Sequence, residues 1–245
     1  MVYYMRMKFV FFGLFLGACA VTWIPDAEFA FVPVAVGGYE IATYQKTGDT
    51  NSPIHIYIEG DGHAFDAYGM PTDDPTPRGT MMRDLAMRDS AANVAYIARP
   101  CQFIMSQSCN ESDWTDGRFS EKIIDAMSSV VRRVAGARPI VLVGYSGGAM
   151  VSGLIIARNP KLKVQEWVTI GGVLNHHDWT EHFGDAPLAR SLDLEKTPNV
   201  PARHFVGTRD RVVPMELTRR AVGNSGRIIE ISGAGHTDFA DVDVF

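Results

Sequence analysis

Apolar and polar positions follow two periods that alternate along the chain. Stretches that are β-branched, alternating or wholly apolar predict strands at 39–47, 54–60, 93–98, 139–144, 164–170, 203–206 and 227–231. Between several of them, apolar residues at a spacing of 3.6 predict helices at 80–90, 119–134, 148–159 and 214–222. The strand PIVLVG is apolar throughout, as expected when helices cover both faces of a sheet. The pattern predicts an α/β fold, a doubly wound and mainly parallel sheet with helices on both faces.

Residues 171–202 form the only insertion between predicted elements that is long enough to cover an edge of this sheet. Ligands in open α/β sheets bind at the carboxyl ends of the strands. Since the insertion is too short for a separate cap domain, we expect a minimal lid and a fairly open pocket.

The first residues have the composition of an export signal. MVYYMRMK carries two basic residues, and the apolar run FVFFGLFLGACA that follows is too short for a stable membrane span. Leu16-Gly17-Ala18-Cys19 resembles a lipobox, so we predict a signal peptide at 1–18, lipidation of Cys19, a tether at 19–37 and one domain at 38–245. Simple secretion with cleavage after Ala20 is the alternative. Both readings predict an exported protein, periplasmic or attached to the cell envelope by the lipid.

Composition narrows the class of partner. The 245 residues carry a net charge of −5 and no concentrated block of Lys or Arg, so we do not expect nucleic-acid binding. Cys101 and Cys109 lie in one polar loop, where an exported protein would join them in a disulfide. Two independent thiols remain the alternative. No His or acidic residue stands at zinc-like spacing from them, and we predict no metal and no cofactor.

Gly144-Tyr145-Ser146-Gly147-Gly148 matches the pattern G-x-S-x-G and joins a predicted strand to a predicted helix. A sharp strand-to-helix turn of this kind presents a serine hydroxyl and needs small neighbours two residues away on either side. The helix that starts there directs its N–H groups at a developing oxyanion. A glycine-rich turn with an idle serine is the competing interpretation.

A serine nucleophile needs a base and a group that orients the base. His236 lies in a glycine-flanked loop after the last predicted strand, and Asp210 follows the strand before it. The chain order Ser146, Asp210, His236 is that of one known arrangement of the Ser-His-Asp triad. Asp238 is a rival acid, but it is too close to His236 in sequence to bond its ring well. The other histidines fall in strands, early in the chain or in a polar loop: His55, His63, His176, His177, His182 and His204.

An oxyanion site needs two N–H donors, and Gly147 would supply one of them. The loop after the strand at 54–60 reads Glu59-Gly60-Asp61-Gly62, and we expect the Asp61 N–H to be the second donor, with Gly62 next. A tight turn without this role is the alternative. Because a carboxylate beside an oxyanion is unfavourable, we expect the Asp61 side chain to turn away or to bind locally.

These residues resemble the α/β-hydrolase superfamily over roughly 39–245. IYIEGDGHAF, DDPTPRG, NVAYIARPCQF, DWTDGRFS and GYSGGAM are similar to a group of bacterial α/β-hydrolases often described as lipoproteins. The resemblance implies the fold and the triad roles of Ser146, Asp210 and His236, but no substrate. One departure concerns the oxyanion loop, where Glu59-Gly60 replaces the His-Gly of many hydrolases.

The sequence therefore predicts an exported serine hydrolase that cleaves a small-molecule or polymer-borne carboxylic ester through an acyl-enzyme. A peptidase or amidase using the same triad is one alternative. A non-catalytic envelope protein that keeps the fold to bind a partner is another.

Overall fold

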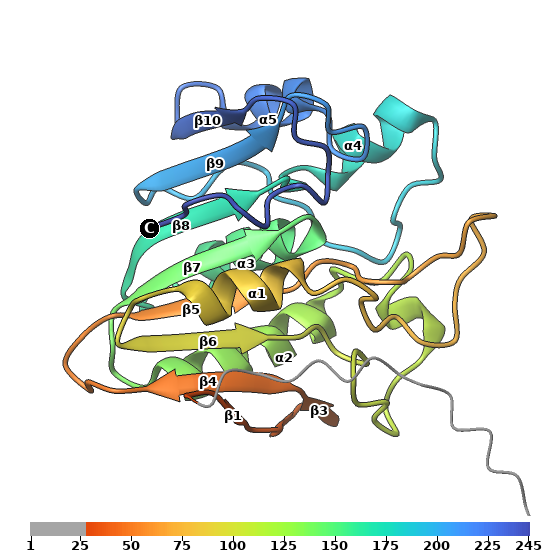
Figure 1. Cartoon of the computed structure of the whole chain (residues 1–245). Coiled ribbons are helices and arrows are strands. Elements are labelled where there is room, and N and C mark those ends of the chain that lie inside the picture. The colour runs from red at the N-terminus through yellow and green to blue at the C-terminus, as the bar shows by residue number, and fades with distance from the viewer. Residues whose placement is uncertain (1–27) are drawn as a thin grey trace, which may run out of the picture.

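A computed structural model describes residues 28–245, and its main feature is an eight-stranded sheet (Figure 1). The strands follow the order β1-β4-β6-β5-β7-β8-β9-β10. In this order, the six neighbouring strands that begin with β6 and end with β10 run parallel. Strand β4 is antiparallel to β6, and β1 is antiparallel to β4. Their bounds are β1 Ala30–Phe31, β4 Thr43–Thr47, β5 Ile54–Ile58, β6 Asn93–Ile97, β7 Ile140–Tyr145, β8 Val164–Ile170, β9 Ala202–Gly207 and β10 Arg227–Ile231.

Helices cover both faces of this sheet. In Figure 1, α1 lies in front of the strands and α2 and α3 lie behind them. The helix bounds are α1 Met81–Arg88, α2 Glu121–Ala135, α3 Gly147–Arg158, α4 His176–Phe183 and α5 Met215–Val222, with a 3₁₀ turn at Glu111–Asp113. The predicted fold class is therefore confirmed, and α4 lies in the insertion at 171–202.

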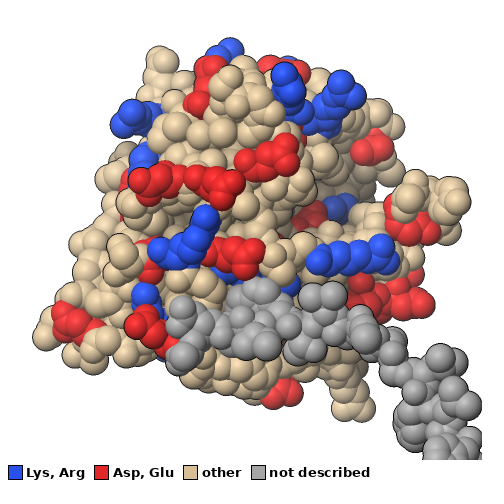
Figure 2. Space-filling view, viewed as in Figure 1, with Lys and Arg blue, Asp and Glu red and all other residues tan. Residues whose placement is uncertain are grey.

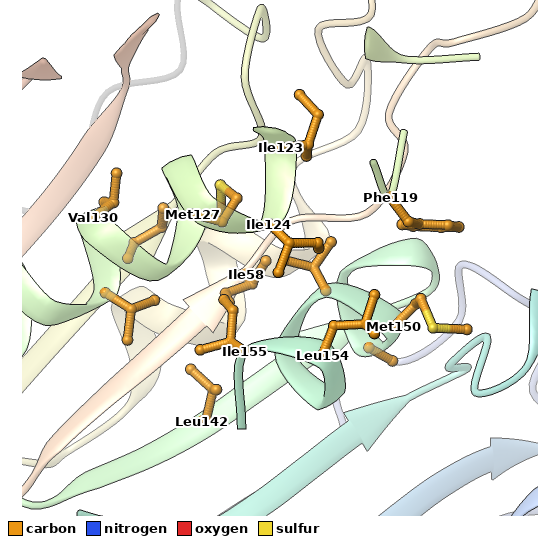
Figure 3. Close-up of a cluster of buried hydrophobic side chains, with 14 of the residues drawn as sticks. Ile58, Phe119, Ile123, Ile124, Met127, Val130, Leu142, Met150, Leu154 and Ile155 are labelled. Carbon is orange, nitrogen blue, oxygen red and sulfur yellow. The ribbon is translucent and has the colours of Figure 1, made fainter. Parts of the chain in front are cut away.

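Side-chain alternation along the central strands divides the core into two layers. Ile56 and Ile58 of β5 pack with α2 and α3, whereas Tyr57 points to the opposite face and packs with α1. Figure 3 shows the first layer, where Ile58 and Leu142 meet Ile155 of α3. Since buried apolar side chains cover both faces, the central strands are apolar on both sides, which explains the sequence of β7.

The N-terminal boundary of the domain differs from the prediction. We expected a tether over 19–37, but β1 pairs with β4, and β2 (Val34–Val36) pairs with β3 (Tyr39–Ile41) in a two-stranded sheet. Phe29 and Val36 are buried, so this segment belongs to the core. Pro33 lies between the short strands β1 and β2, where its missing N–H interrupts no ladder.

The segment predicted as one strand at 39–47 is two strands in the structure. β3 and β4 are separated at Ala42 and pair with different partners, β2 and β6. The predicted signal peptide at 1–18, Cys19 and the start of the tether lie outside the described residues.

Charge is distributed evenly over the face seen in Figure 2. Blue basic groups and red acidic groups intermingle there, so no single sign of charge dominates that face. None of the helices in residues 28–245 is long and apolar enough to cross a bilayer.

Candidate active site

Ser146 occupies the turn between β7 and α3 and has a strained backbone, with φ 50° and ψ −123°. Positive φ is rare for a residue with a side chain, and at a turn of this kind it projects the side chain outward. A Cβ on Gly144 would lie 2.4 Å from the Gly148 carbonyl oxygen, and one on Gly148 would lie 2.5 Å from that of Glu59. Only glycine fits at both positions, which is the physical reason for the G-x-S-x-G pattern.

The structure brings His236 and Asp210 to this serine although they lie 90 and 64 residues away in sequence. His236 Nε2 lies 3.0 Å from Ser146 Oγ, and its Nδ1 lies 2.8 Å from Asp210 Oδ2. A carboxylate only accepts hydrogen bonds, so Nδ1 carries the proton and Nε2 is left as the acceptor for the serine hydroxyl. The three side chains form one hydrogen-bonded chain.

Asp210 is held rigidly while it orients the ring. Its side chain is fully buried, and its second oxygen accepts the N–H groups of Val212 and Val213 at 2.9 and 2.8 Å. The rival acid Asp238 instead accepts the Gly235 N–H and leaves His236 to Asp210. The Tyr145 hydroxyl donates a hydrogen bond to the His236 carbonyl oxygen at 3.1 Å, which anchors the histidine loop.

The loop after β5 lies beside Ser146, as the sequence predicts for the second oxyanion donor. The Gly60 N–H is already taken by the Glu59 carboxyl at 2.9 Å, and Tyr96 donates to the other oxygen of Glu59. Burial raises the pKa of Glu59 against the lowering effect of these two donors. Among the described residues, the N–H groups of Gly147 and Asp61 donate to no backbone acceptor.

The carboxylate of Asp61 binds locally, as expected, and does so to two arginines. Arg118 and Arg99 lie 2.7 and 3.2 Å from its two oxygens. Burial acts to raise the pKa of Asp61, but the charges of Arg118 and Arg99 outweigh it and the pKa is lowered.

A cavity of about 440 Å³ opens over Ser146 and His236. Its walls are mostly apolar, and no Lys or Arg of the described chain lines it. The apolar lining comes from several elements: Pro77, Met81, Met82, Tyr145, Val173, Trp179 and Val212. Trp179 is fixed there because its Nε1 donates to the Val212 carbonyl at 2.7 Å.

Several other cysteine, tryptophan and histidine residues lie away from the serine. Cys101 and Cys109 form a disulfide with Cα atoms 5.8 Å apart. Trp114 is buried and donates to the Thr72 carbonyl, outside the lining of the cavity. His177 groups with Asp178 and Glu181 on the exposed side of α4; exposed carboxylates commonly cluster without an ion, so we assign no metal site there.

Sequence reasoning missed Arg99, Gln102 and Arg118, which lie behind the oxyanion loop. The first two follow β6, whose carboxyl end lies beside that of β5 in the parallel sheet. That adjacency was the available signal, because side chains after neighbouring parallel strands meet at one edge.

Comparison with known proteins supports the fold. No family model and no curated protein matches the sequence. Solved structures do match, among them an α/β serine hydrolase without a lid from Xanthomonas campestris, which is 13% identical over 89% of each chain with a TM-score of 0.55. Est1E from Butyrivibrio proteoclasticus is 13% identical over 85% of this chain and 90% of its own, with a TM-score of 0.59. Carboxylesterase CesB from Bacillus subtilis is 13% identical over 88% and 87%, with a TM-score of 0.56. The protein thus has the α/β-hydrolase fold, as the resemblance implied.

Proposed function

We propose that the protein is a serine hydrolase that cleaves a carboxylic ester through an acyl-enzyme. The observation that carries this proposal is the hydrogen-bonded chain from Ser146 through His236 to Asp210, built on a strained turn at the floor of a cavity. The solved structures with the same fold, which include named serine hydrolases and a carboxylesterase, support it by analogy.

Each group of the site has a role in the proposed reaction. His236 Nε2 takes the proton of Ser146 Oγ as that oxygen attacks the ester carbonyl carbon. The N–H groups of Gly147 and Asp61 stabilise the tetrahedral oxyanion, and the N-terminus of α3 adds its positive dipole end. His236 then gives the proton to the departing alcohol, and water hydrolyses the acyl-enzyme by the same steps.

The cavity favours an apolar and uncharged substrate of moderate size. Its walls are mainly apolar, and the polar groups beside the serine include the carboxyls of Glu59 and Asp61. No Lys or Arg of the described chain lines the cavity, so an anionic acyl chain would lose its hydration there without gaining an ion-pair partner, and we expect neutral esters to react best.

The decisive test is reaction with a fluorophosphonate probe, which labels an activated serine. We expect labelling of the wild-type protein and at least a 10³-fold loss of both labelling and esterase activity in Ser146→Ala, because the nucleophile is removed. Ser152→Ala is the matched control, since Ser152 is buried in α3 and bonds Trp167 away from the cavity. A folded wild-type protein that takes up no probe would exclude the serine hydrolase and leave a binding protein.

Nitrophenyl esters of increasing chain length, compared with the matching anilides, separate an esterase from an amidase on the same triad. Faster turnover of the anilides would replace the ester proposal with the amide one.

We also propose that the protein is exported and anchored by a lipid on Cys19. The Cys101–Cys109 disulfide supports export, because structural disulfides persist mainly outside the reducing cytosol.

A further inference from the structure

The segment 99–118, which follows β6 and contains the disulfide, contacts the oxyanion loop at both of its central residues. We call this segment the brace. Its two arginines bind one carboxylate: Arg99 Nη1 donates to Asp61 Oδ1 at 3.2 Å and Arg118 Nη1 to Oδ2 at 2.7 Å. Both arginine side chains are almost fully buried. The guanidinium of Arg99 also donates to the Arg118 carbonyl, so the arginines are tied to each other.

Gln102 holds the other central residue of the loop. Its Nε2 donates to the Gly60 carbonyl at 3.0 Å, and its Oε1 accepts the Arg99 N–H at 2.9 Å. Gln102 is 1% exposed, and both polar atoms of its side-chain amide are hydrogen-bonded. The brace therefore fixes the carbonyl of Gly60 and the carboxylate of Asp61, one on each side of the Asp61 N–H.

The backbone around Gln102 is held in an unusual conformation. Cys101 has φ 73° and Phe103 has φ 63°, and neither is a glycine. Such residues persist only where the surroundings determine them, and they gather at functional sites. Here the disulfide from Cys101 to Cys109 restrains one flank, and a hydrogen bond from Phe103 N–H to Thr76 Oγ1 at 2.7 Å restrains the other.

Asp61 also lies directly against the other oxyanion donor. A Cβ on Gly147 would fall 2.0 Å from Asp61 Oδ1, so the carboxylate touches the Gly147 backbone. An uncompensated carboxylate at this place would repel a developing oxyanion. The two guanidinium groups more than offset its negative charge, and their hydrogen bonds hold the carboxylate against Gly147.

We propose that Gln102, Arg99 and Arg118 are positioning residues that set the Asp61 N–H relative to the Gly147 N–H, and that the disulfide acts through Gln102. This inference rests on the proposed serine hydrolase function and adds the groups that preorganise its oxyanion hole. No residue of the brace lines the cavity over Ser146, so the brace would affect the transition state more than substrate binding.

The test compares Gln102→Met and Arg118→Met with matched controls in the same region. Gln107→Met changes an exposed glutamine of the same disulfide loop, and Arg190→Met breaks an exposed ion pair with Asp116. With a neutral nitrophenyl ester, we expect kcat to fall by about 10- to 100-fold in the two brace variants with KM within twofold, since a misplaced oxyanion donor costs up to roughly 10²–10³ in kcat. The controls should keep the wild-type kcat.

A conservative variant and a reductant give further readouts. Arg118→Lys retains the charge, so its kcat should recover part of what Arg118→Met loses. A phosphine reductant should lower kcat of the wild-type protein, yet have little further effect on Gln102→Met if the disulfide acts through that residue. Melting temperatures of all variants, measured alongside, show that the assays are run on folded protein.

The outcomes separate this inference from the function on which it rests. Brace variants that melt at lower temperature but keep kcat within twofold of wild type would reduce the brace to a structural role, while Ser146-dependent labelling would still stand. A wild-type protein without labelling or turnover would remove both proposals.

Discussion

At the residue scale, the site depends on a buried carboxylate whose bonds leave it a single orientation. One carboxylate oxygen of Asp210 accepts two backbone N–H groups, and the other accepts the hydrogen bond from His236 Nδ1. That arrangement selects the tautomer with the proton on Nδ1. Nε2 is then unprotonated and faces Ser146, as the proposed base requires.

We expect Asp210→Asn to lower kcat by about 10⁴-fold with little change in the fold, because an amide that offers its NH₂ group to Nδ1 favours the wrong tautomer. Ester hydrolysis of the purified variant measures this effect. Asp238→Asn is the control and should stay within a few-fold of wild type, since Asp238 only accepts the Gly235 N–H. Equal losses in the two variants would contradict the assignment of Asp210.

At the scale of single elements, β9 carries a buried histidine that has no part in the site. His204 is fully buried, its Nδ1 lies 2.8 Å from Thr169 Oγ1, and its ring packs edge-on against Trp167. Burial lowers the pKa of His204 from 6.5 to about 4. Between these two pH values, the His204 ring is neutral in the folded protein, whereas the same ring is protonated in the unfolded chain.

This difference makes stability depend on pH in a known direction. Between pH 6.5 and 4 the unfolded state binds more protons, so stability rises with pH across this window and is lost as pH falls through it. The His204 term amounts to about 2 kcal/mol between pH 7 and pH 5. In His204→Gln, the drop in the free energy of unfolding over that interval should be smaller by this amount, as urea titrations at both pH values would show.

Gln107→Met provides the comparison, because it changes an exposed residue without removing a titratable group and should lose as much stability on acidification as the wild-type protein. If His204→Gln and the wild-type protein lost the same stability on acidification, His204 would not be the group responsible.

At the scale of the whole molecule, the export proposal predicts where the protein is found. Lipidation of Cys19 would place the full chain in the membrane fraction, and Cys19→Ala should release it or leave it unprocessed, because no other residue can take the lipid at that site. Detergent phase partition of the full-length protein measures the difference. Incorporation of a labelled fatty acid, measured alongside, separates a lipid on Cys19 from an uncleaved signal segment, and a wild-type protein that takes up no label would contradict the lipid anchor.

Local features of the sequence were sufficient for the central sheet and for the turn at Ser146. The apolar composition of β7 follows from burial on both faces, and Gly144 follows from a contact with the Gly148 backbone four residues away, whereas Gly148 is required by the distant backbone of Glu59. Chain order then singled out Asp210 and His236, because each follows a strand whose carboxyl end reaches the same edge. The boundary at residue 37 was wrong, because strands of two and three residues such as β1 and β2 are too short to show a period in the sequence.

By itself, therefore, the sequence determined the doubly wound α/β class, the strand-to-helix turn and the order of three chemically matched residues, all of which depend on local periodicity or sterics. Only the tertiary structure decided how the oxyanion loop is held. Asp61 meets Arg99 and Arg118 across 38 and 57 residues, and Gln102 meets Gly60 across 42. Contacts of that length leave no periodic trace in a sequence, because they exist only after the strands have paired in the sheet.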